Sequence, residues 1–214
     1  MSFKLTTAVR VLALDVDGVV LGDGVRLGWA RAAEHHLGIS EDVLQQRFFR
    51  PHWYEAAVGR RSLQDKFAGV IATEGFAFSA DDIIRLWLKD DVRHVNTDAI
   101  HEALAWQREF DERLVLATNQ EAVRAAHIWD GVGLRAHFDR MLVSCELGAT
   151  KPDAEFFTAA DQMLDIERPD EVLLIDDRPN NVEAARYHGW QAVYASGESE
   201  AVAAIQELVS QSRS

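Results

Sequence analysis

Two aspartates, Asp15 and Asp17, stand one residue apart at the end of the short apolar run VRVLALD, residues 9–15. If the strand continued, side chains two residues apart would point to the same face, and Gly18 would then allow the chain to turn sharply. Two carboxylates about 4 Å apart repel each other by roughly 4 kcal/mol at an effective dielectric constant of about 20. A cation or a shared proton relieves this repulsion, so the pair indicates a metal site or acid–base chemistry. Loop turns and calcium sites show the same pattern, and the pair alone does not separate these alternatives.

A second acidic pair, Asp176 and Asp177, ends another apolar run, VLLID, residues 172–176. Two adjacent acids at a strand end could bind a cation together with the first pair. The alternative is a helix N-terminus, where aspartate is a favoured cap and Pro179 fits the first turn.

Two further polar positions could bind a phosphate group. Thr118 and Asn119 follow the run LVLA, and a hydroxyl with neighbouring backbone N–H groups at a strand end can hold phosphate oxygens. Lys151, held by the following Pro152 just before a helical pattern, can supply a point charge to a phosphate. A helix cap and a solvated surface lysine are the respective alternatives.

The elements that must position these residues alternate along the chain. Short apolar runs typical of buried strands lie at 9–15, 114–118, 141–144, 172–176 and 191–194, and helical patterns lie at 97–110, 121–129, 154–164, 181–188 and 200–209. This alternation predicts an α/β fold with a parallel sheet covered on both faces, in which ligands bind beyond the carboxyl ends of the strands. The polar tail after Glu207 is expected to fray.

Residues 21–92 break the alternation and contain only helical patterns, at 27–37, 41–50, 63–73 and 80–88. Ser62 and Ser79 are predicted N-caps, because Asp65 and Asp82 follow three residues later in the capping-box spacing. The sequence therefore predicts a core domain of residues 1–20 and 93–214, with a small helical domain of residues 21–92 inserted after the first strand.

Composition limits the function further. The chain has 214 residues and a formal net charge of −13, which disfavours a general binder of nucleic acid or of anionic membranes. A phosphorylated substrate would need a local positive site. The single cysteine, Cys145, excludes an intrachain disulfide and is predicted to be a buried structural thiol, and no apolar run approaches the ~20 residues of a membrane span. We expect a soluble cytoplasmic protein, and the sequence leaves its oligomeric state open.

Together, the four polar positions closely resemble the four signature motifs of the haloacid dehalogenase-like (HAD) hydrolase superfamily. Asp15 and Asp17 match the first motif, Thr118 the second, Lys151 the third, and Asp176 with Asp177 the fourth. The resemblance covers the full chain and implies a Rossmann-like core with a cap domain of the C1 type formed by the insert.

The resemblance also implies a mechanism, that of a magnesium-dependent phosphohydrolase with an aspartyl-phosphate intermediate. Asp15 would attack phosphorus, ionised with an ordinary aspartate pKa near 3.9, and Asp17 would act as acid and then as base. Mg²⁺ would bind Asp15, Asp17 and Asp177, with Asp176 either a ligand or acting through water. The phosphoryl oxygens would be held by Thr118, Asn119 and Lys151.

Substrate choice is expected to lie in the insert, where Arg50, His52, Trp53 and Arg60 are candidate contacts to the leaving group. Packing and surface charge are the alternative roles of these four. The substrate would be a small phosphorylated metabolite, with a sugar phosphate as one candidate, because the cap pattern resembles sugar-phosphate phosphatases and the N-terminal domains of epoxide hydrolases.

Four rival functions remain. A haloacid dehalogenase shares the fold but lacks the second acid of the first motif, so Asp17 argues against it. Phosphonate hydrolysis needs an activated cap lysine, and nothing marks Lys66 or Lys89 as one. A sugar-phosphate mutase keeps every catalytic residue and stays open. A non-enzymatic binding domain would usually have lost one of the acids that are all present here.

Overall fold

The computed structural model describes residues 3–22, 24–89 and 91–213, with residues 24–28 described by their backbone alone. Positions 23 and 90 of the predicted insert, and positions 1, 2 and 214 of the predicted core, lie outside the described residues. Five parallel strands form one sheet in the order β3-β2-β1-β4-β5. The strands are β1 (Val11–Leu14), β2 (Arg113–Thr118), β3 (Arg140–Val143), β4 (Val172–Asp176) and β5 (Gln191–Tyr194). The predicted α/β fold with a parallel sheet is confirmed.

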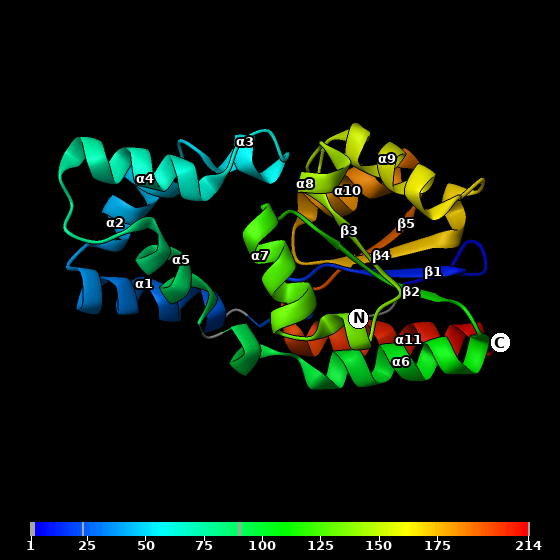
Figure 1. The fold of residues 1–214 in the computed structure, drawn as a ribbon. Coiled ribbons are helices and arrows are strands. Elements are labelled where there is room, and N and C mark those ends of the chain that lie inside the picture. Colours follow the sequence, from blue (N-terminus) through cyan, green and yellow to red (C-terminus); the bar gives the residue numbers. More distant parts are fainter. Residues whose placement is uncertain (1–2, 23, 90, 214) are drawn as a thin grey trace.

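Helices cover both faces of this sheet (Figure 1). One face packs against α6 (Thr97–Phe110) and α11 (Glu198–Ser212), and the other against α9 (Ala154–Leu164) and α10 (Pro179–His188). Side chains of β1 alternate between the two layers: Leu12 and Leu14 join the first, and Val11 and Ala13 the second. All four are fully buried, which explains why this strand is apolar throughout.

Two helical segments of the core differ from expectation. The predicted helix at 121–129 is α7 (Ala122–Ala126) followed by a π-helical turn, η3 (His127–Gly131), in which the N–H of Val132 bonds the carbonyl of His127 at 2.8 Å. The predicted fraying after Glu207 is wrong. The α11 helix continues because the Gln211 side chain bonds the backbone of Leu5 at 2.9 Å, which ties the helix to the N-terminal segment. The core is completed by α8 (Ser144–Leu147) and the 3-10 turns η4 (Leu134–Ala136) and η5 (Pro169–Glu171).

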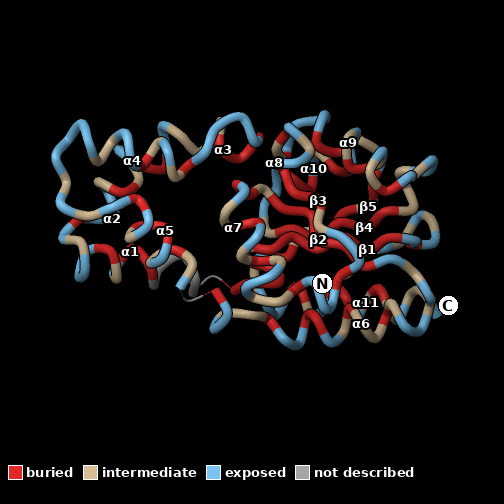
Figure 2. Tube along the Cα trace, in the orientation of Figure 1, coloured by how far each residue is buried: buried red, intermediate tan, exposed pale blue. Residues whose placement is uncertain are grey.

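The insert between β1 and α6 forms a separate helical layer with buried positions of its own (Figure 2). Many of these positions are aromatic and form one cluster. Phe48 and Phe67 lie at its centre, fully buried, with ring centroids 5.3 Å apart. Ser62 and Ser79 cap α4 and α5 as predicted, and Ser79 forms a complete capping box with Asp82. The elements are α1 (Gly24–Leu37), α2 (Glu41–Val43), the π-helix η1 (Leu44–Phe49), α3 (Trp53–Ala57), α4 (Leu63–Glu74), α5 (Ala80–Leu88) and the 3-10 turn η2 (Asp91–His94).

Two close backbone approaches join the insert to the core. At the first, the two connecting segments lie side by side, with the N–H of Gly22 bonded to the carbonyl of His94 at 2.8 Å. At the second, Gly59 (φ +72°) comes so close to the core that a Cβ there would lie 2.2 Å from the backbone oxygen of Cys145. Only glycine allows this approach. The space between these two contacts holds the candidate site.

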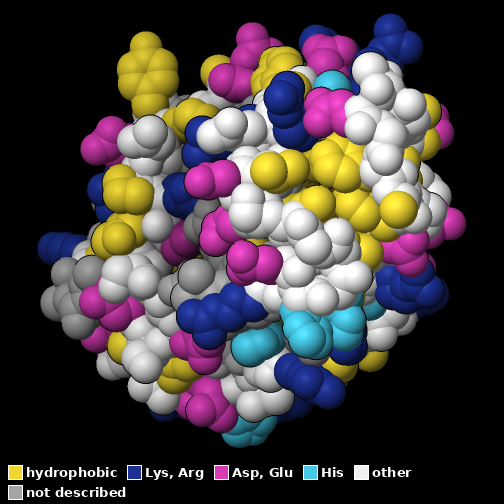
Figure 3. All heavy atoms as spheres, turned by 90° about the vertical axis from the view of Figure 1, so that its left-hand side faces the viewer, with side chains coloured by type: hydrophobic (Ala, Val, Ile, Leu, Met, Phe, Trp, Pro, Cys, Tyr) yellow, Lys and Arg dark blue, Asp and Glu magenta, His cyan; other side chains and the backbone are white. Residues whose placement is uncertain are grey.

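The surface of the insert that faces away from the core carries interspersed acidic and basic side chains (Figure 3). Among the helices that the structure describes, none is both long and apolar enough to cross a membrane.

Candidate active site

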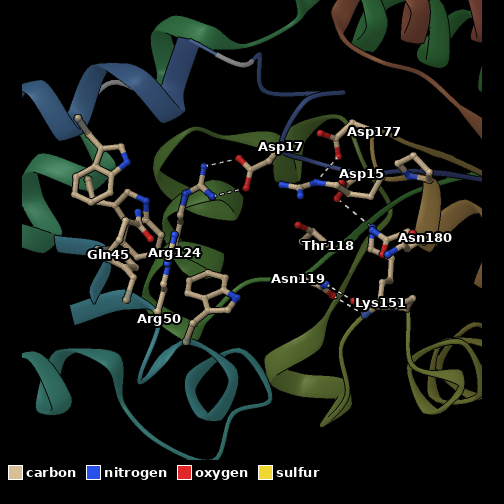
Figure 4. Close-up of a pocket in the computed structure, with 18 of the residues that line it drawn as sticks. Asp15, Asp17, Gln45, Arg50, Thr118, Asn119, Arg124, Lys151, Asp177 and Asn180 are labelled. Atoms are coloured by element: carbon tan, nitrogen blue, oxygen red, sulfur yellow. Dashed lines mark hydrogen bonds and ion pairs between the residues drawn. The ribbon is translucent and has the colours of Figure 1, made fainter. Parts of the chain in front are cut away.

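A cavity of about 1020 Å³ lies between the carboxyl ends of the strands and the insert (Figure 4). Six of the site residues predicted in the core domain line it: Asp15, Asp17, Thr118, Asn119, Lys151 and Asp177. They come from segments far apart in the sequence and meet because parallel strands end at the same edge of the sheet.

Three carboxylates form the acidic centre. Asp15, Asp176 and Asp177 each offer an oxygen, and these oxygens lie within 4.8 Å of one another. Gly18 permits the close approach of the two loops: it has φ +88°, and a Cβ on it would lie 2.7 Å from Cγ of Asp177. A set of clustered carboxylate oxygens suits a hard cation such as Mg²⁺.

Lys151 is the buried cation of this centre. Its Nζ lies 2.6 Å from Oδ2 of Asp176 and 3.1 Å from Oδ1 of Asp15, and it also bonds the carbonyl of Ala117. Burial alone would lower the pKa of Lys151, but the two carboxylates outweigh it and the pKa is raised. The lysine is therefore a fixed positive charge, not the solvated surface residue considered as its alternative.

The Asp15 carboxyl does not have the ordinary pKa expected from the sequence. Burial raises the pKa of Asp15 to about 8, against the lowering effect of Lys151, and the neighbouring aspartates raise it further. The sequence could not show this, because the shift depends on how completely the strand end is buried. One carboxylate oxygen, Oδ1, also accepts the N–H of Val16 at 2.8 Å, so the side chain is held in one orientation.

Asp176 and Asp177 occupy different surroundings. Asp176 is fully buried, and both of its oxygens accept protein hydrogen bonds, from Lys151, from Asn181 and from the backbone N–H of Arg178. Asp177 lines the cavity, with Oδ1 3.4 Å from Nε of Arg178. Asp176 thus fixes the lysine, and Asp177 faces the space in which a ligand would lie.

The second strand end supplies Thr118 and Asn119. Thr118 is buried at the end of β2 and lines the cavity. The Asn119 side chain makes two 2.8 Å bonds with the backbone N–H and carbonyl of Lys151, across the cis peptide bond that joins Lys151 to Pro152. The Asn119 amide group therefore helps to place Lys151.

Asp17 has partners that the sequence did not reveal. Its carboxylate points toward Arg124, on the side opposite Asp15 and Asp177 (Figure 4), and forms a bidentate pair with both bonds at 2.7 Å. Gln120 donates a third bond of 2.7 Å, and Arg124 also reaches the buried Asp91. Within the described residues, the clustered carboxylates therefore number three rather than the four expected.

A weak signal for Arg124 exists in the sequence. It stands four residues before the buried Ile128, which puts a charged side chain on the apolar face of a predicted helix. Such a residue must find a buried partner. Sequence spacing gives no means of identifying Asp17 and Asp91, at 107 and 33 residues' distance, as those partners.

The four candidates in the insert divide evenly. Arg50 and Trp53 line the cavity with five other residues of the insert, Trp29, Glu41, Gln45, Phe49 and Trp87. His52 and Arg60 are absent from the lining among the residues described. Arg60 instead pairs with Glu55 at 3.3 Å and lies over the Tyr54 ring, which fits the alternative of surface packing.

Comparison with known proteins gives the following matches. Residues 9–189 match the family model described as haloacid dehalogenase-like hydrolase. The chain is 25% identical over 213 residues to bifunctional epoxide hydrolase 2 of Sus scrofa, with 87% of this chain and 36% of that protein covered, so it spans about a third of that protein's length. It is also 25% identical over 193 residues to a phosphoglycolate phosphatase of Chromobacterium violaceum, with 86% of this chain and 84% of that protein covered.

Solved structures share the fold. A HAD family enzyme of Bacteroides thetaiotaomicron, in complex with magnesium and inorganic phosphate, superposes with a TM-score of 0.71 at 18% identity, covering 87% of this chain and 94% of the other. The L-2-haloacid dehalogenase of Xanthobacter autotrophicus, with chloropropionic acid covalently bound, superposes with a TM-score of 0.61 at 18% identity, covering 87% and 77%.

Proposed function

We propose that this chain, which belongs to the haloacid dehalogenase-like hydrolase family, is a magnesium-dependent phosphatase that acts on a small phosphorylated metabolite. The observation that carries the proposal is the grouping of Asp15, Asp177 and the Lys151–Asp176 pair at one edge of the sheet, with a further acid, Asp17, in the same cavity. A nucleophilic carboxylate, a cation site, a fixed positive charge and a separate acid are the parts that phosphoryl transfer through an acyl phosphate needs.

The arrangement of Asp15 supports its role as nucleophile. Its Oδ1 is held by Lys151 and by the N–H of Val16, so the other oxygen remains to attack phosphorus. Attack would form the Oδ–P bond and break the ester P–O bond, and the leaving oxygen would take a proton from Asp17. The ionised Asp17 would then remove a proton from water, whose oxygen attacks phosphorus and releases Asp15.

Mg²⁺ would be held by Asp15 and Asp177, and the family resemblance implies the backbone carbonyl of Asp17 as a further ligand. Asp176 would not bind the cation directly but would hold Lys151 in place. When bound, it supplies positive charge that screens the attacking carboxylate from the phosphoryl oxygens. Lys151, the Thr118 hydroxyl and the backbone N–H of Asn119 would hold those oxygens in the transition state.

The helical insert would serve as a cap of the C1 type over this site. Its cavity wall combines the tryptophans Trp29, Trp53 and Trp87 with the polar side chains of Glu41, Gln45 and Arg50. Such a mixture suits a leaving group that has both an apolar surface and hydroxyl or anionic groups, and a sugar phosphate is one candidate. The likeness to a phosphoglycolate phosphatase supports phosphatase chemistry without defining the substrate.

The test is phosphate release from a panel of phosphorylated metabolites, after treatment with a chelator and again after addition of Mg²⁺. We expect activity that depends on Mg²⁺ and disappears in Asp15→Asn, with Asp130→Asn as the control, since Asp130 is exposed and pairs only with a surface arginine among its described contacts. Full activity of Asp15→Asn, or activity without metal, would refute the mechanism.

The same experiment can detect the products of two rival reactions. Halide release from a 2-haloacid would identify a dehalogenase, as in the structural neighbour, although Asp17 and its charged partners argue against that chemistry. An isomerised phosphosugar in place of free phosphate would identify a mutase.

A further inference from the structure

The Asp17 carboxylate is held at both oxygens. Arg124 donates from Nη1 to Oδ2 and from Nη2 to Oδ1, each at 2.7 Å (Figure 4). Gln120 Nε2 donates to Oδ2 at 2.7 Å. The two bonds to Arg124 turn the carboxylate away from Asp15 and Asp177 (Figure 4). In this conformation Asp17 cannot protonate a leaving oxygen.

Arg124 is itself fixed from behind. Its side chain is 4% exposed, and its Nε lies 3.3 Å from Oδ2 of Asp91, whose side chain is fully buried. The guanidinium also lies 5.4 Å from the Trp87 ring centroid. Burial lowers the pKa of Arg124, but Asp17 and Asp91 outweigh it and raise the pKa, so the guanidinium stays charged.

These contacts join three parts of the molecule. Arg124 belongs to α7 of the core, Asp17 to the loop after β1, and Asp91 to the η2 turn that leads from the insert back to the core. Arg124 is buried and Asp17 partly exposed, and a bidentate pair in this setting is both stronger and more directional than a surface ion pair. The arginine is therefore built to keep one orientation of Asp17.

We propose that Arg124 is a positioning residue that holds Asp17 away from the reacting centre and must release it before the leaving oxygen is protonated. The inference rests on the phosphatase function proposed above. In the released state, Asp17 gains a proton from solvent, turns to the ester oxygen and donates that proton as the P–O bond breaks. Arg124 keeps Asp91 as its partner throughout, so no buried charge is left alone.

The role predicts an effect that depends on the leaving group. p-Nitrophenolate leaves without protonation, whereas the alkoxide of glycerol 2-phosphate needs a proton from Asp17. Arg124→Lys keeps the positive charge beside Asp91 but cannot form the two parallel bonds to Asp17. We expect the ratio of kcat/KM for glycerol 2-phosphate to that for p-nitrophenyl phosphate to rise about tenfold in this variant.

The ratio is chosen because both substrates are measured on the same preparation, so a lower fraction of folded enzyme cancels. Arg135→Lys is the matched control, since Arg135 is an exposed arginine paired with Asp130, and it should leave the ratio unchanged. Asp17→Asn sets the opposite direction, because removing the acid should lower the ratio. An unchanged or lowered ratio in Arg124→Lys would overturn the inference.

A second variant covers the case in which Arg124→Lys does not fold. Gln120→Leu removes one of the three bonds to Asp17, and also a side-chain oxygen, Oε1, that is buried without a described partner, while Arg124 and Asp91 stay paired. It should raise the ratio in the same direction by a smaller factor, and no rise would count against the inference. If the wild type releases phosphate neither from these two esters nor from any member of the panel, the proposed function and this inference fail together, whereas an active wild type with an unchanged ratio in the variants refutes only the inference.

Discussion

Gly18→Ala tests whether the approach of two loops builds the acidic centre. Gly18 has φ +88°, and a Cβ there would lie 2.7 Å from both Cγ and Oδ2 of Asp177. The backbone strain of an alanine at this φ costs about 1–2 kcal/mol. The overlap cannot be relieved without moving Asp177 or the loop that carries Asp17, so the substitution should also damage cation binding.

Gly133→Ala is the matched control. Gly133 also has φ +88°, and a Cβ on it would meet nothing within 4 Å. Both variants should therefore lose about 2–8 °C in Tm, since 1 kcal/mol corresponds to about 2–4 °C for a chain of this size. Only Gly18→Ala should require about tenfold more Mg²⁺ for half-maximal phosphate release, because it disturbs the support of a metal ligand.

The measurements are thermal unfolding of the metal-free proteins and phosphate release as a function of Mg²⁺ concentration. If Gly18→Ala has the Mg²⁺ dependence of Gly133→Ala and of the wild type, then Asp177 is not placed by this contact or does not hold the cation. An unchanged Mg²⁺ dependence would therefore contradict the prediction, whatever the loss of Tm.

Three further predictions concern ionisable side chains that are buried or partly buried: Asp15, Lys151 and Cys145. Since burial raises the pKa of Asp15 to about 8, the folded protein binds this proton more tightly than the unfolded chain. Without metal, the wild type should therefore lose stability relative to Asp15→Asn as the pH rises from about 4 to about 8. A difference in Tm that stays constant over this range would contradict the prediction. Lys151→Met leaves the carboxylates of Asp15 and Asp176 without their cation, so it should cost about 3–5 kcal/mol in urea unfolding and abolish phosphate release, whereas a loss below 1 kcal/mol would contradict the pairing. Burial, then Glu146 and Glu121, raise the pKa of Cys145 to about 11, so alkylation of the folded protein at pH 8 should be at least tenfold slower than in urea, and equal rates would contradict it.

The fold could be predicted because its strands are apolar for a physical reason that sequence displays. β1 and β4 are buried on both faces; Asp15 directly follows β1, and Asp176 is the last residue of β4. Strand ends in a parallel sheet converge whatever the loops between them do, so the meeting of Asp15, Thr118 and Asp177 follows from the order of elements. The capping roles of Ser62 and Ser79 in the insert could also be predicted, because a cap is a contact between residues three apart in the sequence.

The parts of the site that were missed depend on contacts between residues distant in sequence. Spacing placed Asp17 beside Asp15, but its orientation is decided by Arg124, and nothing in either local pattern links the two. The raised pKa of Asp15 depends on the summed burial of the strand end. His52 and Trp53 are adjacent in the sequence, yet of these two described residues only Trp53 lines the cavity.

The charge balance of the site supports the proposed cation. Five carboxylates, Asp15, Asp17, Asp91, Asp176 and Asp177, outnumber the two buried cations, Lys151 and Arg124, and the half-exposed Arg178 beside Asp177. Without metal, the excess of negative charge is relieved by the proton that the raised pKa of Asp15 retains, and a protonated carboxyl is a poor nucleophile. A divalent cation held by Asp15 and Asp177 would replace that proton and leave Asp15 ionised. On the proposed mechanism, binding of Mg²⁺ and activation of the nucleophile are therefore one event, which is how an acidic chain can attack an anionic substrate.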